Sequence, residues 1–136
     1  MKMRAPLLAT LLTAATMAAA ADPAAAENHE IAELLAVLGA SSCQFYRNGS
    51  WHDGRAAETH LQRKYDYLRK RGLAESAEQF IANGATKSSL SGTPYQVKCG
   101  NADPVSSAQW LGEQLALLRS RRGGAEPSRP APRARD

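Results

Sequence analysis

The chain has 136 residues, with 17 Lys and Arg against 13 Asp and Glu, and a formal net charge of +4. The excess positive charge lies near the two ends, because Glu27 to Leu118 holds nine Lys or Arg against ten Asp or Glu, a net of −1. This central part is neutral, so its composition does not favour nucleic acid as a partner. About 110 residues remain after a leader, which is enough for one domain and not for two.

The leader begins with Lys2 and Arg4, which precede an uncharged run rich in Leu and Ala from Ala5 to Ala21. A basic start, a short apolar run and a small-residue end are typical of a secretory signal peptide. The run is too short and too rich in Ala for a stable membrane span. We therefore expect residues 1–21 to be a signal peptide, with cleavage as late as residue 26. The protein would then be periplasmic or secreted, with no stable membrane insertion after cleavage.

The first helix of the domain follows the leader. Its apolar residues recur at the spacing i, i+3, i+4 and i+7, which is the pattern of an amphipathic helix: Ile31, Leu34, Leu35 and Leu38. Asn28 is the expected N-cap, and Gly39 is expected to end the helix.

A β-hairpin follows, with arms Gln44 to Arg47 and Ser50 to Asp53 joined by Asn48-Gly49. This dipeptide accepts positive φ at both central positions of a type I′ turn. In that register Tyr46 faces Trp51 and Phe45 faces His52.

Two further helices are expected after the hairpin. Asp53 can cap the first of them, which ends near Arg69-Lys70-Arg71-Gly72, where three cations suit the negative end of the helix dipole. The second covers Glu75 to Asn83. The hydroxyl-rich segment from Lys87 to Thr93 is expected to be irregular.

The last elements are a strand and a helix. The segment Tyr95 to Cys99 alternates apolar and polar residues, which predicts a short half-buried strand. Ser106 and Gln109 form a capping box at the start of a helix that runs to about Arg121. We expect one globular domain over residues 27–121. Residues 122–136, rich in Pro and Arg, are expected to form a disordered basic tail.

The chain has two cysteines, Cys43 and Cys99. In an exported protein of this size they are most simply one disulfide, which would join the hairpin to the last strand. A catalytic cysteine paired with His52 or His60 would need a free thiolate in an oxidising compartment and is disfavoured. No zinc-type spacing is present, and we expect no metal and no cofactor.

These elements predict an α+β fold in which four helices pack on a small antiparallel sheet, built from the Asn-Gly hairpin and one further strand, with one disulfide. Three stretches carry a resemblance to a known family: CQFYRNGSWHDGRAAETHLQRKYDYLRKRG, AEQFIANGATKSSLSGTPYQVKCG and SSAQWLGEQLALLR. They resemble the YfeK-like family of small secreted bacterial proteins of unknown function. The resemblance supports export and the disulfide, and it implies no activity.

Two groups of residues are candidates for contact with a ligand or partner. In the hairpin, Arg47 and His52 are not required by the turn, the cap or the core, and Trp51 lies beside them, although cross-strand packing alone accounts for most hairpin aromatics. The second group lies in the loop from Lys87 to Tyr95. Its candidate residues are Lys87, Ser89, Ser91 and Tyr95. They can bind an anion or a sugar, or the serines can instead form hydrogen bonds with the backbone of the loop.

His60, Lys64 and Tyr67 share one face of the helix after the hairpin, most simply as a partly buried amphipathic face. The favoured function is a non-enzymatic binding or interaction module for a periplasmic protein or an envelope polymer. The alternative is a small envelope hydrolase or transferase using a serine of the loop with Lys87 or a histidine. A weaker alternative is a role like that of periplasmic lysozyme inhibitors. The segment from Ser91 to Tyr95 resembles the SGxxY loop of those proteins.

Overall fold

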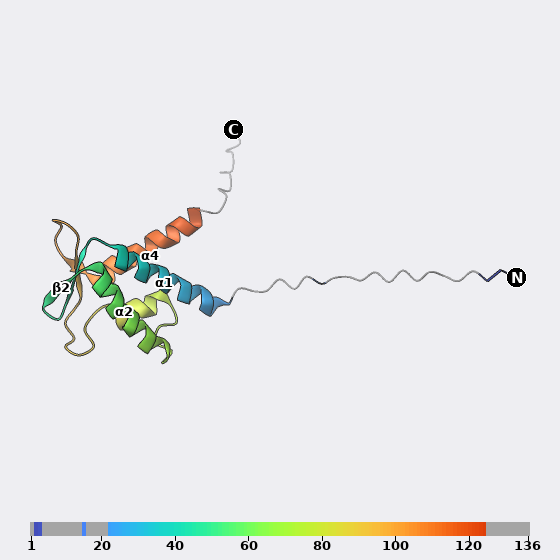
Figure 1. Ribbon diagram of the computed structural model, residues 1–136, viewed down its shortest axis with the longest axis horizontal. Helices are drawn as coiled ribbons and strands as arrows, with labels where there is room; N and C mark the ends of the chain where they lie inside the picture. Colours follow the sequence, from blue (N-terminus) through green and yellow to red (C-terminus); the bar gives the residue numbers. More distant parts are fainter. Residues whose placement is uncertain (1, 4–14, 16–21, 125–136) are drawn as a thin grey trace, which may run out of the picture.

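The computed structural model describes residues 2–3, 15 and 22–124. Most of the predicted signal peptide and the tail from residue 125 lie outside the described residues. The described part contains four helices and one four-stranded antiparallel sheet (Figure 1). The predicted α+β class is therefore confirmed. None of the helices in the described part is long and apolar enough to span a membrane.

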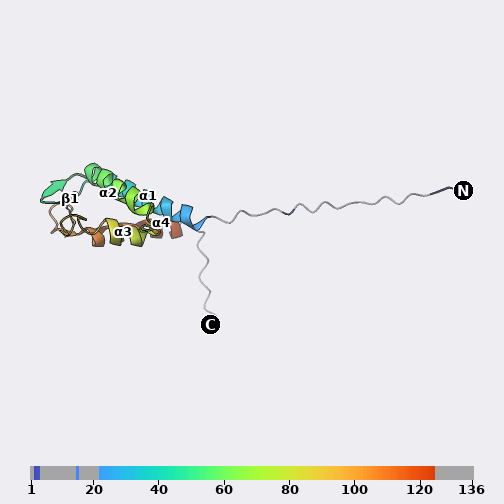
Figure 2. The same ribbon diagram turned by 90° about the horizontal axis from the view of Figure 1, so that it is seen from below.

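The four helices form two layers with the sheet at one end (Figure 2). Helices α1 (Pro23–Ala40) and α2 (Gly54–Arg69) form one layer, and α3 (Ala77–Gly84) and α4 (Ser107–Gly124) form the other. The core lies between the layers and continues under the sheet. Its largest fully buried side chains are Phe80, Ile31, Leu34, Leu38, Leu111 and Val97.

Helix α1 begins earlier than predicted. Its N-cap is Asp22, whose side chain accepts a hydrogen bond from the Ala24 amide, and Pro23 occupies the first turn, where a missing N–H costs nothing. The prediction that Asn28 caps the helix is wrong. The side chain of Asn28 instead accepts a 2.6 Å hydrogen bond from the Tyr65 hydroxyl and so links α1 to α2.

The hairpin has the predicted register. Strands β1 (Gln44–Arg47) and β2 (Ser50–His52) pair Phe45 with His52 and Tyr46 with Trp51. Asn48 and Gly49 have φ values of 50° and 86°, as a type I′ turn requires.

The sheet has one more strand than predicted. Strand β3 (Gln96–Lys98) pairs with β1, and a two-residue strand β4 (Val105–Ser106) pairs with β3, which gives the order β2-β1-β3-β4. The Ser106 side chain also caps α4, because it accepts a hydrogen bond from the Gln109 amide. The Gln109 side chain bonds Glu113 instead of closing the predicted capping box.

The other helix boundaries lie near the predicted ones. Asp53 caps α2, with its carboxylate 2.8 Å from the Ala56 amide. Gly54 allows a close approach, because a Cβ there would lie 2.5 Å from the Leu38 carbonyl oxygen of α1. Helix α4 continues to Gly124, so residues 122–124 are helical rather than part of the expected tail.

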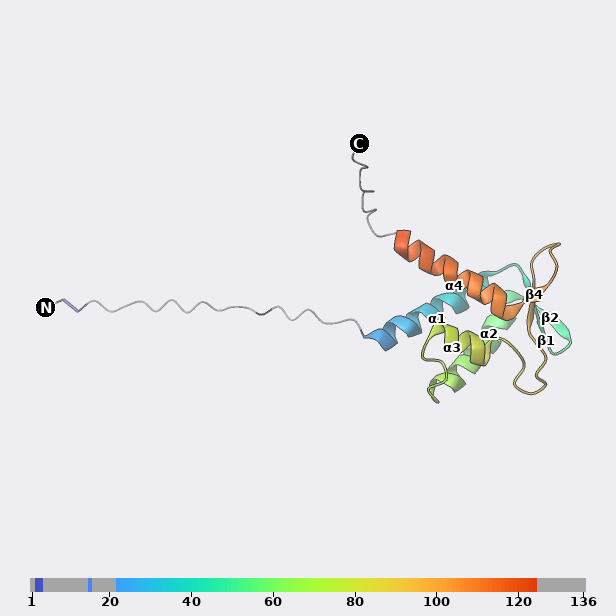
Figure 3. The same cartoon turned by 180° about the vertical axis from the view of Figure 1, so that it is seen from behind.

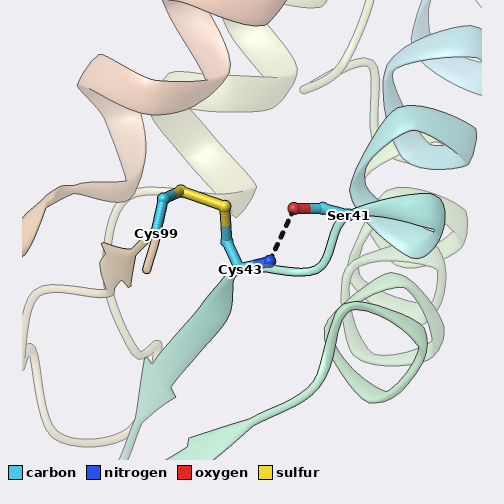
Figure 4. The surroundings of a disulfide bond; sticks show 3 residues. All are labelled: Ser41, Cys43 and Cys99. Carbon is cyan, nitrogen blue, oxygen red and sulfur yellow. Dashed lines mark hydrogen bonds between the residues drawn. A yellow bond between two sulfur atoms is a disulfide. The ribbon is translucent and has the colours of Figure 1, made fainter. Parts of the chain in front are cut away.

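Cys43 and Cys99 form the predicted disulfide, which closes the end of β1 onto the end of β3 (Figure 4). The Cys43 amide donates to the Ser41 hydroxyl, so the chain between α1 and β1 is fixed at the same point.

At the other end of the molecule, an ion-pair network joins three helices. Glu30 of α1 is buried and accepts two hydrogen bonds from Arg119 of α4, at 3.1 and 2.7 Å, and a third contact from Arg122 at 2.9 Å. Arg119 also pairs with Glu78 of α3. Figure 3 shows that α1 and α4 both extend from the sheet toward this end.

Candidate functional site

Basic and aromatic side chains converge where the hairpin meets α2. Phe45 is buried under the sheet, and side chains alternate along a strand, so Arg47 lies on the same inner face of β1. His52 lies on that face too, because it pairs with Phe45. Helix α2 adds His60 and Lys64, one turn apart.

Tyr95, which immediately precedes β3, connects these groups. Its hydroxyl lies 3.0 Å from His60 Nε2 and accepts a 3.2 Å hydrogen bond from Lys64 Nζ. Lys64 Nζ also donates to the Lys87 carbonyl at 3.1 Å and lies 5.0 Å from the centre of the Tyr95 ring. Since the Tyr95 oxygen accepts from Lys64, its own hydrogen is free to be donated to His60.

Two adjoining depressions meet at His60. The first, between the hairpin and α2, has a volume of about 30 Å³ and is lined by Arg47, His52, His60 and Tyr95 among others. This is room for about one water molecule or one small polar group. The second is open and broader, about 320 Å³, and its lining includes Arg63, Lys64, Tyr67 and Ser89. We call the two together the basic depression.

The charges around His60 are all positive. Burial, together with the positive charges of Arg47 and Lys64, lowers the pKa of His60 from 6.5 to about 4, so the ring is neutral near pH 7. Burial also lowers the pKa of Lys64 and raises the pKa of Tyr95. Tyr95 therefore acts as a neutral hydrogen-bond donor.

No carboxylate balances these cations. Among the described residues that line either depression there is no Asp or Glu. Within the same part of the chain, neither Arg47 nor Lys64 takes part in a salt bridge. Both side chains are half-buried. Partly buried cations without a carboxylate to balance their charge are costly, and an anionic group placed here would relieve that cost.

The structure gathers some of the predicted site residues and separates others. Arg47, His52 and Tyr95 line the first depression, and Ser89 lines the second. The loop is attached to the hairpin, because the Ser91 hydroxyl donates to the Asn48 side chain at 3.2 Å.

Three predicted residues do not line the basic depression. The Ser91 hydroxyl bonds Asn48 and Thr93. The Lys87 side chain is exposed, and this residue contacts the site through its carbonyl oxygen. Trp51 lies on the opposite face of the sheet and packs against Tyr46.

His60 and Lys64 were not among the predicted site residues. Their i, i+4 spacing on one helix face was visible in the sequence, but it is equally the pattern of an ordinary partly buried face. Their shared partner, Tyr95, is 35 and 31 residues away. Only the tertiary structure brings the three together.

Two of the three loop serines, Ser88 and Ser91, form hydrogen bonds within the loop or to the hairpin. Ser88 is buried, and its hydroxyl accepts from the amides of Leu90 and Ser91. Ser91 also bonds Thr93. In the described structure no hydrogen bond joins a serine of this loop to a lysine or histidine side chain, which is the contact that activates a serine nucleophile.

Comparison with known proteins places the chain in a family. A model of the family of unknown function DUF5329 matches residues 25–119. The chain belongs to this family. The DUF5329 match includes all four helices in whole or in part, the whole sheet and the basic depression, and it confirms the resemblance to YfeK-like proteins.

One relative of this DUF5329 protein is the uncharacterised protein YfeK of Salmonella typhimurium, 39% identical over 71 residues. That alignment includes 49% of this chain and 58% of the relative, so the chain spans little more than half the length of YfeK. No solved structure matches this DUF5329 chain.

Proposed function

We propose that this DUF5329 protein is an exported, non-enzymatic binding module that receives an anionic group of an envelope protein or polymer in the basic depression. The observation that carries the proposal is the set of half-buried cations around His60 with no carboxylate beside them. The first depression, about 30 Å³, has room for one carboxylate or phosphate group, and the open second depression, about 320 Å³, leaves space beside it for the rest of a larger ligand.

Export is supported by the leader pattern of residues 1–21 and by the disulfide, since disulfides persist in oxidising compartments. The contacts of the loop favour binding over a hydrolase that uses Ser88 or Ser91, because both hydroxyls are occupied by structural hydrogen bonds.

The proposal is tested with the purified, oxidised protein and a pair of short peptides, one rich in Glu and the other with Gln at the same positions. The Glu peptide should bind with an affinity that falls as salt is raised, and the Gln peptide should not bind. Calorimetric titration at low ionic strength measures both.

The variants Arg47→Gln and Lys64→Gln should each weaken binding of the Glu peptide by about tenfold, in the range of one charge-assisted hydrogen bond. Lys70→Gln, which removes an exposed charge at the end of α2, is the matched control and should change the affinity by less than about twofold. Lys87→Ala should resemble this control, because the contact is made by the carbonyl of that residue. Equal loss in Lys70→Gln and Arg47→Gln would mean that only net charge matters, and the proposed site would be wrong.

A further inference from the structure

The outer face of the sheet carries a continuous row of side chains across all four strands. Trp51 of β2 pairs with Tyr46 of β1, which pairs with Gln96 of β3, which pairs with Ser106 of β4. Phe45 and Val97, the neighbours of Tyr46 and Gln96, are buried under the sheet. Because side chains alternate along a strand, the row lies on the side away from the core.

Aromatic surface is available at one end of this row. The Trp51 and Tyr46 rings pack edge to face, with centroids 5.3 Å apart and planes at 61°. Cross-strand packing fixes the rings, yet 39% of Trp51 stays exposed. An indole held in this way offers a rigid apolar plane with a polar N–H at its rim.

Amides and one cation surround the aromatic pair. Gln96 is exposed beside Tyr46, and a second pair on the same face, Gln44 and Lys98, is exposed as well. None of the outward-facing residues of the four strands is acidic. The disulfide of Cys43 and Cys99 adjoins the Gln44–Lys98 pair and holds β1 against β3 (Figure 4), so the face is rigid before any ligand arrives.

The dimensions of the face decide which kind of ligand fits. Four strands of two to four residues, about 4.8 Å apart, give a face of roughly 10 by 14 Å at most. That is far below the roughly 800 Å² per partner that a stable protein interface buries. It suits two or three sugar rings, whose C–H faces stack on an aromatic plane while their hydroxyl and acetamido groups bond amides.

We propose that the outer sheet face binds a carboxylate-bearing saccharide, with a sugar ring on Trp51, polar groups on Gln44 and Gln96, and the carboxylate toward Lys98. This is a second site, centred on the outer face of the sheet. It is independent of the function proposed above, although Tyr46 and Gln96 also line the first depression.

The test uses the fluorescence of Trp51. The chain has two tryptophans, and the other, Trp110, is buried. A soluble oligomer of alternating N-acetylglucosamine and N-acetylmuramic acid is titrated into the full processed protein, in parallel with a neutral N-acetylglucosamine oligomer of equal length. The acidic oligomer should give a saturable change in emission at lower concentration than the neutral one.

Variants assign the binding to this face. By calorimetric titration, Trp51→Ala should weaken binding of both oligomers by about tenfold, and Trp51→Tyr, which keeps a ring, by less. Lys98→Gln should remove the preference for the acidic oligomer and leave binding of the neutral one unchanged. Leu117→Ala, which truncates a similarly exposed side chain on α4, is the control and should change nothing.

Unaltered affinity in a folded Trp51→Ala variant, or no saturable signal with either oligomer, overturns the proposal. Arg47→Gln separates the two sites. If it abolishes saccharide binding while Trp51→Ala does not, the saccharide occupies the basic depression, the proposal for the outer face is wrong and the proposed function stands.

Discussion

The two ends of the molecule differ in whether their basic side chains are paired with carboxylates. At the helical end, Arg119 and Arg122 reach the buried carboxylate of Glu30, and Arg119 also pairs with Glu78. At the sheet end, Arg47 and Lys64 are half-buried in a depression whose described lining has no carboxylate.

We relate the paired charges at the helical end to stability and the unpaired charges at the sheet end to the proposed binding. Charges that satisfy one another across α1, α3 and α4 hold helices together and need no ligand. Cations that are partly removed from water and left unpaired cost stability, and such groups gather where a protein binds or reacts. The comparison therefore supports the proposed binding site at the sheet end. It also implies that removing a charge should have opposite effects on stability at the two ends.

The largest expected effect is on stability and comes from the disulfide, which links β1 to β3 at the sheet end. The double variant Cys43→Ser with Cys99→Ser opens a bridge between residues 56 positions apart. We expect it to lower the free energy of unfolding by about 4 kcal/mol in the chain-entropy model, measured by urea denaturation. In hydrogen exchange, amides of β1 and β3 should lose more protection than those of α1 and α4.

The wild-type protein treated with a reducing agent is the control for this variant and should behave in the same way. A loss below about 1 kcal/mol would show that the sheet end is held by its core packing alone.

The next effect is at the helical end. Glu30→Gln should lower the free energy of unfolding by about 2 kcal/mol, because it leaves Arg119 and Arg122 without their buried partner. Glu33→Gln, which removes a more exposed carboxylate 3.6 Å from Arg122, is the matched control and should cost about 0.5 kcal/mol or less.

Acid titration sharpens the same prediction. Hydrogen bonds from Arg119 are the main cause that lowers the pKa of Glu30. The stabilisation is therefore complete above the unfolded pKa of about 4.3 and is lost as the pH falls through the lower folded value. If Glu30→Gln and Glu33→Gln prove equally mild, the ion network is not what holds the helical end.

The third effect is the pH dependence of the sheet end. The pKa of His60 is about 4 in the folded protein, against about 6.5 in the unfolded chain. Between these values the unfolded state binds the extra proton, so stability is complete above pH 6.5 and falls as the pH drops toward 4. From pH 7 to 5 the wild-type protein should lose about 1 kcal/mol more than His60→Gln, after allowance for solvent screening.

Urea denaturation at the two pH values measures this difference. Glu30 does not interfere, because both proteins keep it and its contribution cancels in the comparison. Parallel pH curves for the two proteins would contradict the assignment of a neutral, buried His60.

The smallest expected effect is the most direct test of the difference between the two ends. Here removing a charge should raise the free energy of unfolding, whereas at the helical end it should lower it. Arg47→Met keeps much of the side-chain volume and removes an unpaired charge, so we expect the free energy of unfolding to rise by about 0.5 kcal/mol. The same variant should lose the binding of acidic peptides. Arg63→Met, at an exposed position of α2, serves as the control for the gain in stability. A loss of stability in Arg47→Met comparable to that in Glu30→Gln would mean that the two ends do not differ.

Much of the fold was predictable because its signals are local. The Asn48-Gly49 turn fixed the register of β1 and β2, and Asp53 marked the start of α2. The start of α1 was misplaced because Pro23 to Ala26 also resemble the end of a leader. Strand β4 was missed because two residues carry no periodicity, and their pairing depends on where β3 lies.

The candidate site was only partly predictable, because it combines residues that are far apart in the sequence. Arg47 and His52 stood out because neither turn, cap nor core required them, and Tyr95 stood out as the end of the hydroxyl-rich loop that begins at Lys87. Trp51 also stood out, but the alternation of side chains sends it to the other face of the sheet. His60 and Lys64 were indistinguishable from an ordinary helix face until Tyr95 was placed against them.

The sequence by itself determined most of the secondary structure, the single disulfide and the family, because turn dipeptides, caps, apolar spacing and a pair of cysteines act over short distances or leave one choice. The tertiary structure alone decided which charges are neutralised. Pairing depends on the distance between groups far apart in the chain, and the same residue type, arginine, is satisfied at position 119 and left without a carboxylate at position 47.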